Sequence, residues 1–403
     1  MGNDETIHIC FAIQDRDGNY CQYLGVALYS LLDNTKRKVS VHILHDDTLT
    51  EDNKNKLICV GNQFSADINF YLVDPAIFPE SSAYDRYSVA AMYRLLLAKL
   101  LPKYIERTLY LDSDILVNLD VEELYDFNIG DNCLAGCRNI YGEYFSARNP
   151  FYDMGLMSPE RYINDGIMLI NLKNIREQHD LFVETMNFLA EYPKSLYPDQ
   201  DALNFVFKER IAFLPKEYNM PTMILRDNKE KMDKAIYHYQ GDRPCISSDD
   251  YFDKLYFDYL VKTPWGSGED ILKMFRSKAI NMENKLENLR RALPSKISRT
   301  IVFWGGDSIQ GKRIRSLFAV NPDEDYFVDN NKSLWGKRHK ENGLPIKNPS
   351  TLMEENKDNI FVVVLSKNYY PDIKRQLESY GFSEMENFID GYLLLHEVEG
   401  GRG

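Results

Sequence analysis

Two aspartates stand one residue apart in the middle of an apolar run. In "RTLYLDSDILVNL", residues 107–119, Asp112 and Asp114 interrupt a stretch that otherwise has the composition of a buried β-strand. An unpaired carboxylate is costly to bury, so the pair must lie at a strand end, at a turn or on a cation. If the chain turns here, both carboxylates can converge on one hard divalent cation, which prefers oxygen ligands. Such an ion can bind a diphosphate and absorb the charge that develops on it as a leaving group.

This short pattern has two other interpretations. Exposed carboxylates at the end of a strand are common and need no cation. The run also resembles the phosphatase signature DxDx[TV], in which the first Asp is a nucleophile. Leu116 stands where that signature has Thr or Val. The motif also lies far from the N-terminus, which argues against a phosphatase.

The segments before this run indicate how it is positioned. Strand, helix, strand, helix and strand are predicted in turn for residues 7–13, 23–34, 39–47, 51–64 and 67–74. This order predicts a parallel sheet with helices on both faces, in which ligands gather beyond the carboxyl ends of the strands. Asp112 and Asp114 follow such an end. Single helices are predicted over residues 88–104, which contain Arg94, and over residues 175–191.

Composition excludes several classes of protein. A chain of 403 residues exceeds one ordinary core, so two domains are expected. The net charge of −13 disfavours nucleic-acid binding, which needs a clustered basic face. No apolar run approaches the roughly 20 residues of a membrane-spanning helix, and no secretory signal opens the chain, so we expect a cytoplasmic protein. The six cysteines are scattered and are expected to be reduced.

Six motifs in register resemble the glycosyltransferases of family 8. They are "FAIQDRDGNYCQYLGVALYSL", "MYRLLLAKLL", "LYLDSDILVNL", "YINDGIMLINL", "DQDALN" and "HYQG", and the resemblance covers roughly residues 7–262. This family comprises retaining enzymes of the GT-A fold that use uridine diphosphate (UDP) sugars. The resemblance therefore implies an α/β fold with a GT-A mixed sheet flanked by helices in residues 1–262. A helical connector is expected at 263–295, and a smaller Rossmann-like α/β domain at 296–403.

The resemblance also implies a metal site and a donor site. Asp112, Asp114 and His238 match the family's ligands for Mn²⁺, with Mg²⁺ as the alternative ion, although a lone His in an apolar segment is more often structural. A neutral imidazole is compatible with manganese beside carboxylates. The residues implied at the donor are Ala12, Asn19, Tyr20, Arg94, Asn164, Asp165, Asp199, Gln200, Gly241 and Arg243.

Within the donor set, Ala12, Asn19 and Tyr20 match the uridine-binding region, where the ring of Tyr20 offers a face for the base. Gln14 stands where relatives often have Asp. Asp165 replaces a residue that is small in some relatives, and its role is open. Relatives usually carry Lys-Pro-Trp after the His and Gly, whereas "HYQGDRPC" offers Arg243, which can also neutralise phosphate.

Arg94, Asp199 and Gln200 match the family's catalytic positions. A buried Arg on an apolar helix needs an anionic or acceptor-rich partner, which favours this assignment independently. Asp199 is expected to bind sugar hydroxyls, and Gln200 to face the anomeric carbon. Because an amide is a poor nucleophile, this favours a short-lived oxocarbenium ion attacked by the acceptor from the leaving-group side. Asp201 has the alternative role of capping the helix that opens with "ALNFVF".

The segment "GGDSIQGKR" near the start of the last domain invites two motif assignments. As a P-loop it has Gly311 and Lys312, but Arg313 replaces the Ser or Thr that would hold magnesium, which excludes nucleoside triphosphate hydrolysis. As a dinucleotide fingerprint it is followed by Asp329 at the expected place, but Asp307 puts negative charge into the phosphate cradle. We therefore expect a degenerate Rossmann-like module that acts as a scaffold or docking surface.

The resemblance thus implies a metal-dependent retaining hexosyltransferase that moves galactose or glucose from its UDP-sugar to a saccharide acceptor. The acceptor expected from bacterial relatives is a glycan on a surface adhesin. Aromatic residues of the loop at 138–162 are candidates to stack on acceptor sugars. They are Tyr141, Tyr144, Phe145 and Tyr152. The alternative is a non-catalytic UDP-sugar or glycan-binding protein, against which the intact metal motif argues.

Overall fold

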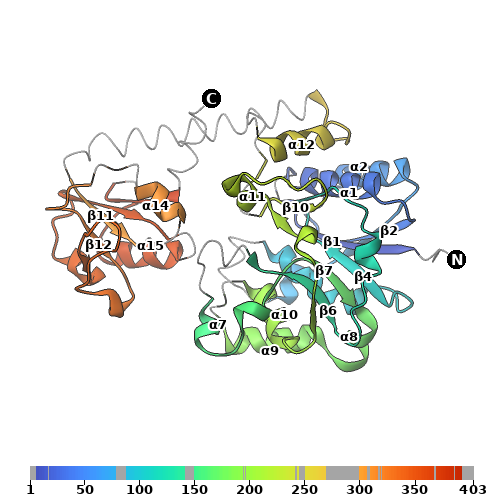
Figure 1. Cartoon of the computed structure of the whole chain (residues 1–403), viewed down its shortest axis with the longest axis horizontal. Helices are drawn as coiled ribbons and strands as arrows, with labels where there is room; N and C mark the ends of the chain where they lie inside the picture. Colours follow the sequence, from blue (N-terminus) through green and yellow to red (C-terminus); the bar gives the residue numbers. More distant parts are fainter. Residues whose placement is uncertain are drawn as a thin grey trace. The chain divides into compact units, whose positions relative to one another are not determined.

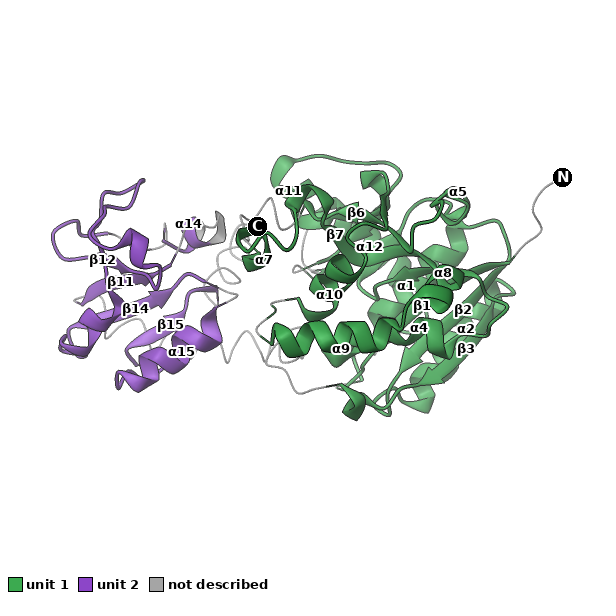
Figure 2. Ribbon diagram, turned by 90° about the horizontal axis from the view of Figure 1, so that it is seen from below, with its two compact units in different colours: residues 1–144, 148–271 green, residues 145–147, 272–403 purple. Residues whose placement is uncertain are grey.

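The computed structural model describes residues 6–16, 18–78, 88–140, 149–193, 195, 197–240, 243–244, 250–268, 299–305, 309–315, 318, 320–366, 369–384 and 386–392. The chain divides into two compact units, residues 1–144 with 148–271 and residues 145–147 with 272–403 (Figure 2). Each unit has its own β-sheet.

The first unit opens with the predicted order of strands and helices. The elements are β1 (Ile7–Ile13), α1 (Cys21–Asn34), β2 (Val39–His45), α2 (Glu51–Gln63) and β3 (Asp67–Leu72). The three strands are parallel, with β2 in the middle. β1 and β2 are buried along almost their whole length, which explains why they lack the alternation typical of half-exposed strands. Thr50 caps α2, because its side chain accepts a hydrogen bond from the main-chain N of Asn53.

The larger sheet is mixed. β4 (Arg107–Leu111), β6 (Leu134–Arg138), β7 (Ile163–Asn171) and β8 (Ile211–Phe213) complete seven strands in the order β3-β2-β1-β4-β7-β6-β8. β4 is parallel to β1, whereas β7 is antiparallel to both β4 and β6. α1 and α2 lie on one side of this sheet, and α9 (Leu181–Glu191) and α10 (Pro198–Val206) lie on the other (Figure 1).

Two predicted helices have different boundaries or types in the structure. Residues 88–104 form a 3₁₀ helix, η2 (Val89–Leu96), followed by the short α-helix α4 (Leu97–Leu100). With three residues per turn, a 3₁₀ helix stacks Arg94 over Ala91, whose carbonyl accepts from Arg94 Nε at 2.8 Å. The helix predicted over 175–191 is two helices, α8 (Leu172–Gln178) and α9. Asp180 separates them, because its carboxylate caps α9.

A second, three-stranded sheet has the order β5-β10-β9. Its strands are β5 (Ile115–Val117), β9 (Met220–Pro221) and β10 (Ile236–His238). β10 is antiparallel to β5 and parallel to β9, so His238 lies opposite Ile115 and beside Pro221. Among the described residues, the other helices of this unit are η1 (Pro75–Ile77), α5 (Glu122–Tyr125), α7 (Pro150–Asp153), η3 (Pro159–Arg161), η4 (Lys216–Tyr218), α11 (Thr222–Asn228) and α12 (Tyr251–Leu260).

The chain after α12 packs back on the first unit. Trp265 is buried, and its indole Nε1 donates to Asn53 Oδ1 at 3.1 Å. Its ring covers Gly25 of α1, where an added Cβ would lie 2.4 Å from a ring carbon. Residues as far as Trp265 therefore pack with the first unit, beyond the boundary predicted at 262. The rest of the predicted connector, residues 269–295, lies outside the described residues.

The second unit has a five-stranded parallel sheet in the order β13-β12-β11-β14-β15. Its elements are β11 (Thr300–Trp304), α14 (Ile309–Arg315), β12 (Tyr326–Val328), η5 (Lys332–Leu334), β13 (Ile346–Lys347), η6 (Pro349–Met353), β14 (Ile360–Val364), α15 (Tyr370–Ser379) and β15 (Phe388–Asp390). Separate apolar clusters pack on its two faces. This doubly wound order confirms the predicted Rossmann-like domain. β13 was not predicted, because two residues carry no periodicity.

The Rossmann-type loop is only partly described. Gly306 and Asp307 lie outside the described residues. Asp329 follows β12, and its Oδ1 accepts from Asn331 N at 2.7 Å. This turn contact gives the Asp329 carboxylate a structural role, consistent with the scaffold interpretation.

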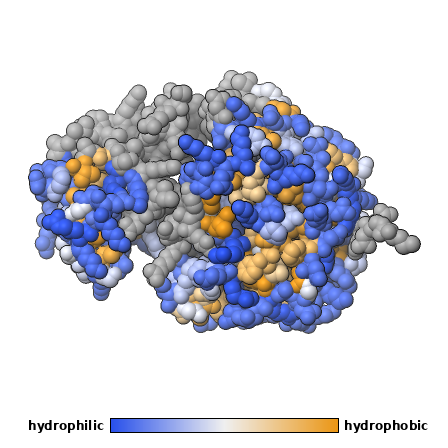
Figure 3. Space-filling model, viewed as in Figure 1, coloured by the Kyte–Doolittle hydropathy of each residue, from blue (hydrophilic) through white to orange (hydrophobic). Residues whose placement is uncertain are grey.

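Two further features of the protein are its surface and its cysteine thiols. On the face shown in Figure 3, hydrophilic residues cover most of the described surface, and apolar residues appear in separate groups. No helix in the described part of the chain is long and apolar enough to cross a membrane. The five described cysteines are free thiols, and all except Cys59 are buried.

Candidate active site

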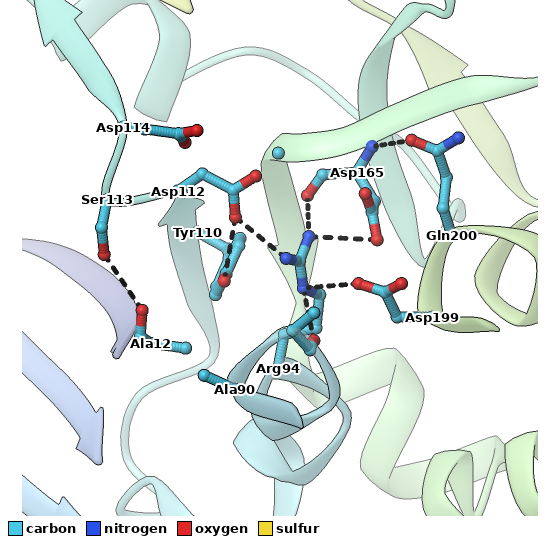
Figure 4. A network of polar contacts seen from close by, with 12 residues as sticks. Ala12, Ala90, Arg94, Tyr110, Asp112, Ser113, Asp114, Asp165, Asp199 and Gln200 are labelled. Atoms are coloured by element: carbon cyan, nitrogen blue, oxygen red, sulfur yellow. Dashed lines mark hydrogen bonds and ion pairs between the residues drawn. The ribbon is translucent and has the colours of Figure 1, made fainter. Parts of the chain in front are cut away.

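The DSD run forms a turn between the two sheets of the first unit. β4 ends before residues 112–114 and β5 begins after them. The main-chain N of Asp112 donates to Gly166 O at 2.7 Å, which fixes the turn to β7. Ser113 Oγ donates to Ala12 O at 3.0 Å, which fixes it to β1 (Figure 4). The run therefore lies beyond the carboxyl end of β4, where the sequence placed it.

Asp112, Asp114 and His238 bring their ligand atoms to one point. All three atoms lie within 4.8 Å of one another. His238 Nε2 is 3.4 Å from Asp114 Oδ1 and 3.8 Å from Asp112 Oδ2. The pairing of β10 with β5 produces this convergence, since Tyr239 N donates to Asp114 O at 2.9 Å.

Space and donor chemistry at this triad suit a divalent cation. Gly166 faces the triad, and a Cβ there would lie 2.5 Å from His238 Cε1 and 2.7 Å from Asp112 Oδ2. Two carboxylates and one imidazole are a suitable donor set for Mn²⁺. The imidazole is buried, whereas both carboxylates are partly exposed, so an ion and a ligand can reach them from solvent.

Electrostatic coupling within the triad is strong. Burial lowers the pKa of His238, but the hydrogen bond and the charge of Asp114 outweigh it and raise this pKa overall. Burial raises the pKa of Asp114, but His238 outweighs it and lowers this pKa overall. Burial raises the pKa of Asp112, and the charge of Arg94 offsets only part of that rise. Concentrated ionisable groups with shifted pKa values are typical of functional sites.

Arg94 contacts three carboxylates at once. The guanidinium lies 2.9 Å from Asp112 Oδ1 through Nη2, 3.0 Å from Asp165 Oδ2 through Nη1 and 3.5 Å from Asp199 Oδ2 through Nε. Nη1 also donates to the main-chain O of Asp165 at 2.6 Å, and the ring of Tyr110 lies 4.4 Å from Cζ. Figure 4 shows this side chain reaching from η2 into the acidic group. The buried Arg94 therefore has three acidic partners, where at least one was expected from the sequence.

Asp165 and Asp199 both lie beside Arg94. Burial raises the pKa of Asp165 well above its ordinary value; Arg94 opposes this shift, and the charges of Asp199 and Asp112 add to it. The position whose role the sequence left open therefore holds a buried carboxyl group against the Arg94 guanidinium.

Gln200 is held from both ends of its amide. Its Oε1 accepts from Asn164 Nδ2 at 3.0 Å and from Asp165 N at 3.3 Å. Its Nε2 donates to the hydroxyl of Tyr162 at 3.0 Å. The amide orientation is therefore fixed by a main-chain N–H, which can only donate.

Asp201 anchors the far side of this network. It accepts at 2.6 Å from each of Tyr162 OH, Asn149 Nδ2 and Ser195 Oγ. The suggestion that Asp201 caps a helix opening with residue 202 is wrong. α10 already begins at Pro198, so Asp201 lies in its first turn.

The predicted nucleotide residues lie near the end of β1 and in the loop that precedes α1. Ala12 contacts the DSD turn through its carbonyl, which accepts from Ser113 Oγ. Asn19 is exposed, and its carbonyl accepts from Gln22 Nε2 at 2.8 Å. Tyr20 precedes α1, and the guanidinium carbon of Arg243 lies 5.4 Å from the centre of its ring. The charge of the exposed Arg243 side chain is one of the effects that lower the pKa of Asp114, after those of His238.

Some predicted residues cannot be placed. Gly241 and the loop aromatics Tyr141, Tyr144 and Phe145 lie outside the described residues. Tyr152 is in α7, where its ring packs edge-on against Tyr162 at 5.7 Å between centroids.

Residues 9–243 match the sequence profile of "Glycosyl transferase family 8". The chain belongs to glycosyl transferase family 8. The matched range contains Asp112, Asp114, His238 and the acidic group around Arg94. This family match argues against the phosphatase interpretation of the DSD run.

Relatives of this family 8 glycosyltransferase include proteins named as lipopolysaccharide glucosyltransferases and galactosyltransferases. A lipopolysaccharide 1,2-glucosyltransferase of Escherichia coli is 27% identical over 62% of this chain and 78% of its own. A lipopolysaccharide 1,3-galactosyltransferase of Salmonella typhimurium is 25% identical over 56% of this chain and 69% of its own. The crystal structure of galactosyltransferase LgtC with donor and acceptor sugar analogs superposes with a TM-score of 0.55 and 26% identity, covering 65% of this chain and 98% of LgtC. The predicted GT-A fold is confirmed.

Two residues of this candidate site were not identified from the sequence. Asn219 Oδ1 lies 2.9 Å from His238 Nδ1, and Tyr162 OH links Gln200 to Asp201. Neither belongs to a motif whose chemistry can be recognised by spacing. The only signal for Tyr162 was its place at the start of "YINDGIMLINL".

Proposed function

We propose that this glycosyltransferase is a metal-dependent retaining hexosyltransferase that moves galactose or glucose from its UDP-sugar to a saccharide acceptor. The convergence of Asp112, Asp114 and His238, with ligand atoms within 4.8 Å of one another, carries the proposal. Relatives named for glucosyl and galactosyl transfer support a hexose donor. A glycan of a bacterial surface adhesin remains our predicted acceptor.

Asp112, Asp114 and His238 would hold Mn²⁺, or Mg²⁺ in its place. When bound there, the cation supplies positive charge that offsets the charge developing on the departing diphosphate. Arg94 binds Oδ1 of Asp112 and so orients its Oδ2 toward His238. Asp199 presents a carboxylate beside Arg94 that can accept hydrogen bonds from sugar hydroxyls.

The surroundings of Gln200 support front-side attack. Its Oε1 already accepts two N–H groups, so both lone pairs are engaged and neither is available to attack an anomeric carbon. The acceptor oxygen then bonds to the anomeric carbon on the face that the diphosphate leaves. The breaking C–O bond gives its electron pair to UDP, and a diphosphate oxygen takes the acceptor's proton, so configuration is retained.

The test is UDP release from UDP-galactose and UDP-glucose with Mn²⁺, with and without small saccharides, and with a chelator in parallel. We expect turnover with one of these donors. We expect the turnover rate to fall at least about 100-fold in Asp114→Asn and when the metal is chelated, because charge stabilisation of this kind typically contributes that much. Asp258→Asn, an exposed position on α12, is the matched control. NMR of the product reports the anomeric configuration. Tight donor binding without metal-supported turnover of any donor selects the binding-protein alternative.

A further inference from the structure

A buried chain of side-chain amides joins His238 to the first turn of α10. Asn219 Oδ1 lies 2.9 Å from His238 Nδ1, and Asn219 Nδ2 lies 2.7 Å from Asn164 Oδ1. Asn164 Nδ2 in turn lies 3.0 Å from Gln200 Oε1. All four residues are at most 6% exposed. The chain thus connects a proposed metal ligand to the residue facing the donor sugar.

The direction of every hydrogen bond in this chain follows from one main-chain group. The N–H of Gly166 can only donate, and it donates to Asn164 Oδ1 at 3.1 Å, so that atom is the oxygen. The group of Asn219 that faces this oxygen must then be its NH₂. The remaining atom of the Asn219 amide is an acceptor, and it faces His238 Nδ1. The Nδ1 atom therefore carries a proton.

We infer that Asn219 is a positioning residue that turns the Nε2 lone pair of His238 toward the cation and couples this ligand to Gln200 through Asn164. The inference rests on the proposed metal-dependent function. In the neutral imidazole that can bind a cation, a proton on Nδ1 leaves the lone pair on Nε2, the atom that faces Asp114 Oδ1 at 3.4 Å when no cation is bound. The backbone supports the arrangement, because β9 pairs with β10 immediately after Asn219.

Two substitutions of Asn219 distinguish its contact with His238 from its contact with Asn164. Asn219→Ala removes both, which frees the imidazole to rotate or change tautomer. Asn219→Asp keeps an acceptor for His238 Nδ1 but places a carboxylate oxygen against Asn164 Oδ1, where the parent distance is 2.7 Å. Asn164 must then turn, and it loses its contact with Gln200 or with Gly166. Asn219→Asp should therefore separate metal affinity from turnover.

The experiment measures Mn²⁺ binding in the presence of UDP, by the loss of the free-ion EPR signal, together with sugar transfer. Asn219→Ala is expected to bind Mn²⁺ about 10- to 100-fold more weakly than the parent, the usual effect of removing a partner of a metal-bound His. Asn219→Asp is expected to bind Mn²⁺ within about 3-fold of the parent and to lose about 10-fold or more in kcat. Asn62→Ala, an exposed position on α2, is the control.

The outcomes separate this inference from the function on which it rests. Parent-like Mn²⁺ affinity in Asn219→Ala overturns the positioning role alone, as does equal loss of affinity in both Asn219 variants. A parent chain that binds no Mn²⁺ with UDP overturns the proposed function as well. If Asn219→Ala does not fold, the split between affinity and kcat in Asn219→Asp decides the question by itself.

Discussion

Arg94 binds one oxygen of Asp112, with Nη2 2.9 Å from Oδ1, while the other oxygen, Oδ2, faces His238 Nε2 at 3.8 Å. The two oxygens of this carboxylate therefore have different partners. The same guanidinium also contacts Asp165 and Asp199. A divalent ion bound by Oδ2 of Asp112 would add positive charge beside this group of acids.

Arg94→Met is expected to destabilise the first unit and to abolish transfer. The substitution keeps volume but leaves buried carboxylates without their cation, a loss that typically costs about 3–5 kcal/mol. Denaturant unfolding measures the change in free energy, and donor turnover measures the activity. Arg94→Lys is the comparison, because it keeps the charge but cannot reach all three acids. Equal stability of the parent and Arg94→Met would show that the acids are not held by this guanidinium.

Gly166→Ala is expected to weaken Mn²⁺ binding by about 10-fold or more while the fold persists. The new Cβ would lie 2.5 Å from His238 Cε1 and 2.7 Å from Asp112 Oδ2, so two ligands must move apart. Mn²⁺ titration with UDP checks the affinity, and thermal unfolding checks the fold. Gly268→Ala is the matched control, because a Cβ there meets nothing within 4 Å. Parent-like affinity in Gly166→Ala would contradict the proposed position of the ion.

The three candidate metal ligands could be proposed from the sequence because their residue types carry the chemistry. Asp112, Asp114 and His238 lie in motifs at strand ends, and strand ends can be read from apolar runs. Asn219 has no such signal, because its contact with His238 arises from the pairing of β9 with β10, two short strands without periodicity. The 3₁₀ geometry around Arg94 was missed for a related reason. Apolar spacing over a few residues does not separate three from 3.6 residues per turn.

Trp265→Ala is expected to destabilise the first unit by about 3–5 kcal/mol, the usual cost of removing a buried Trp side chain. It uncovers Gly25 and removes a hydrogen bond to Asn53. Calorimetric unfolding should show a lower transition for the first unit only, since the second unit has its own core. Trp335→Ala, in the second unit, is the reciprocal control. An unchanged first transition would support a domain boundary at 262.

Tyr162→Phe is expected to lower kcat by about 10-fold and to leave Mn²⁺ affinity unchanged. The substitution removes the acceptor of Gln200 Nε2, so the amide can rotate, but it leaves the contact between Asn219 and His238 intact. Asp201 keeps Asn149 and Ser195 as donors, so the loss of stability should be about 1–3 kcal/mol.

Steady-state transfer and Mn²⁺ titration of the same preparations separate the two effects of Tyr162→Phe. Tyr104→Phe, at a 76% exposed side chain, is the control. A parent-like kcat in Tyr162→Phe would mean that Asn164 and Asp165 N hold Gln200 without the hydroxyl. A fall in metal affinity would mean that strain passes along the whole amide chain to His238. Only a fall in kcat at constant affinity fits a Tyr162 that orients Gln200 alone.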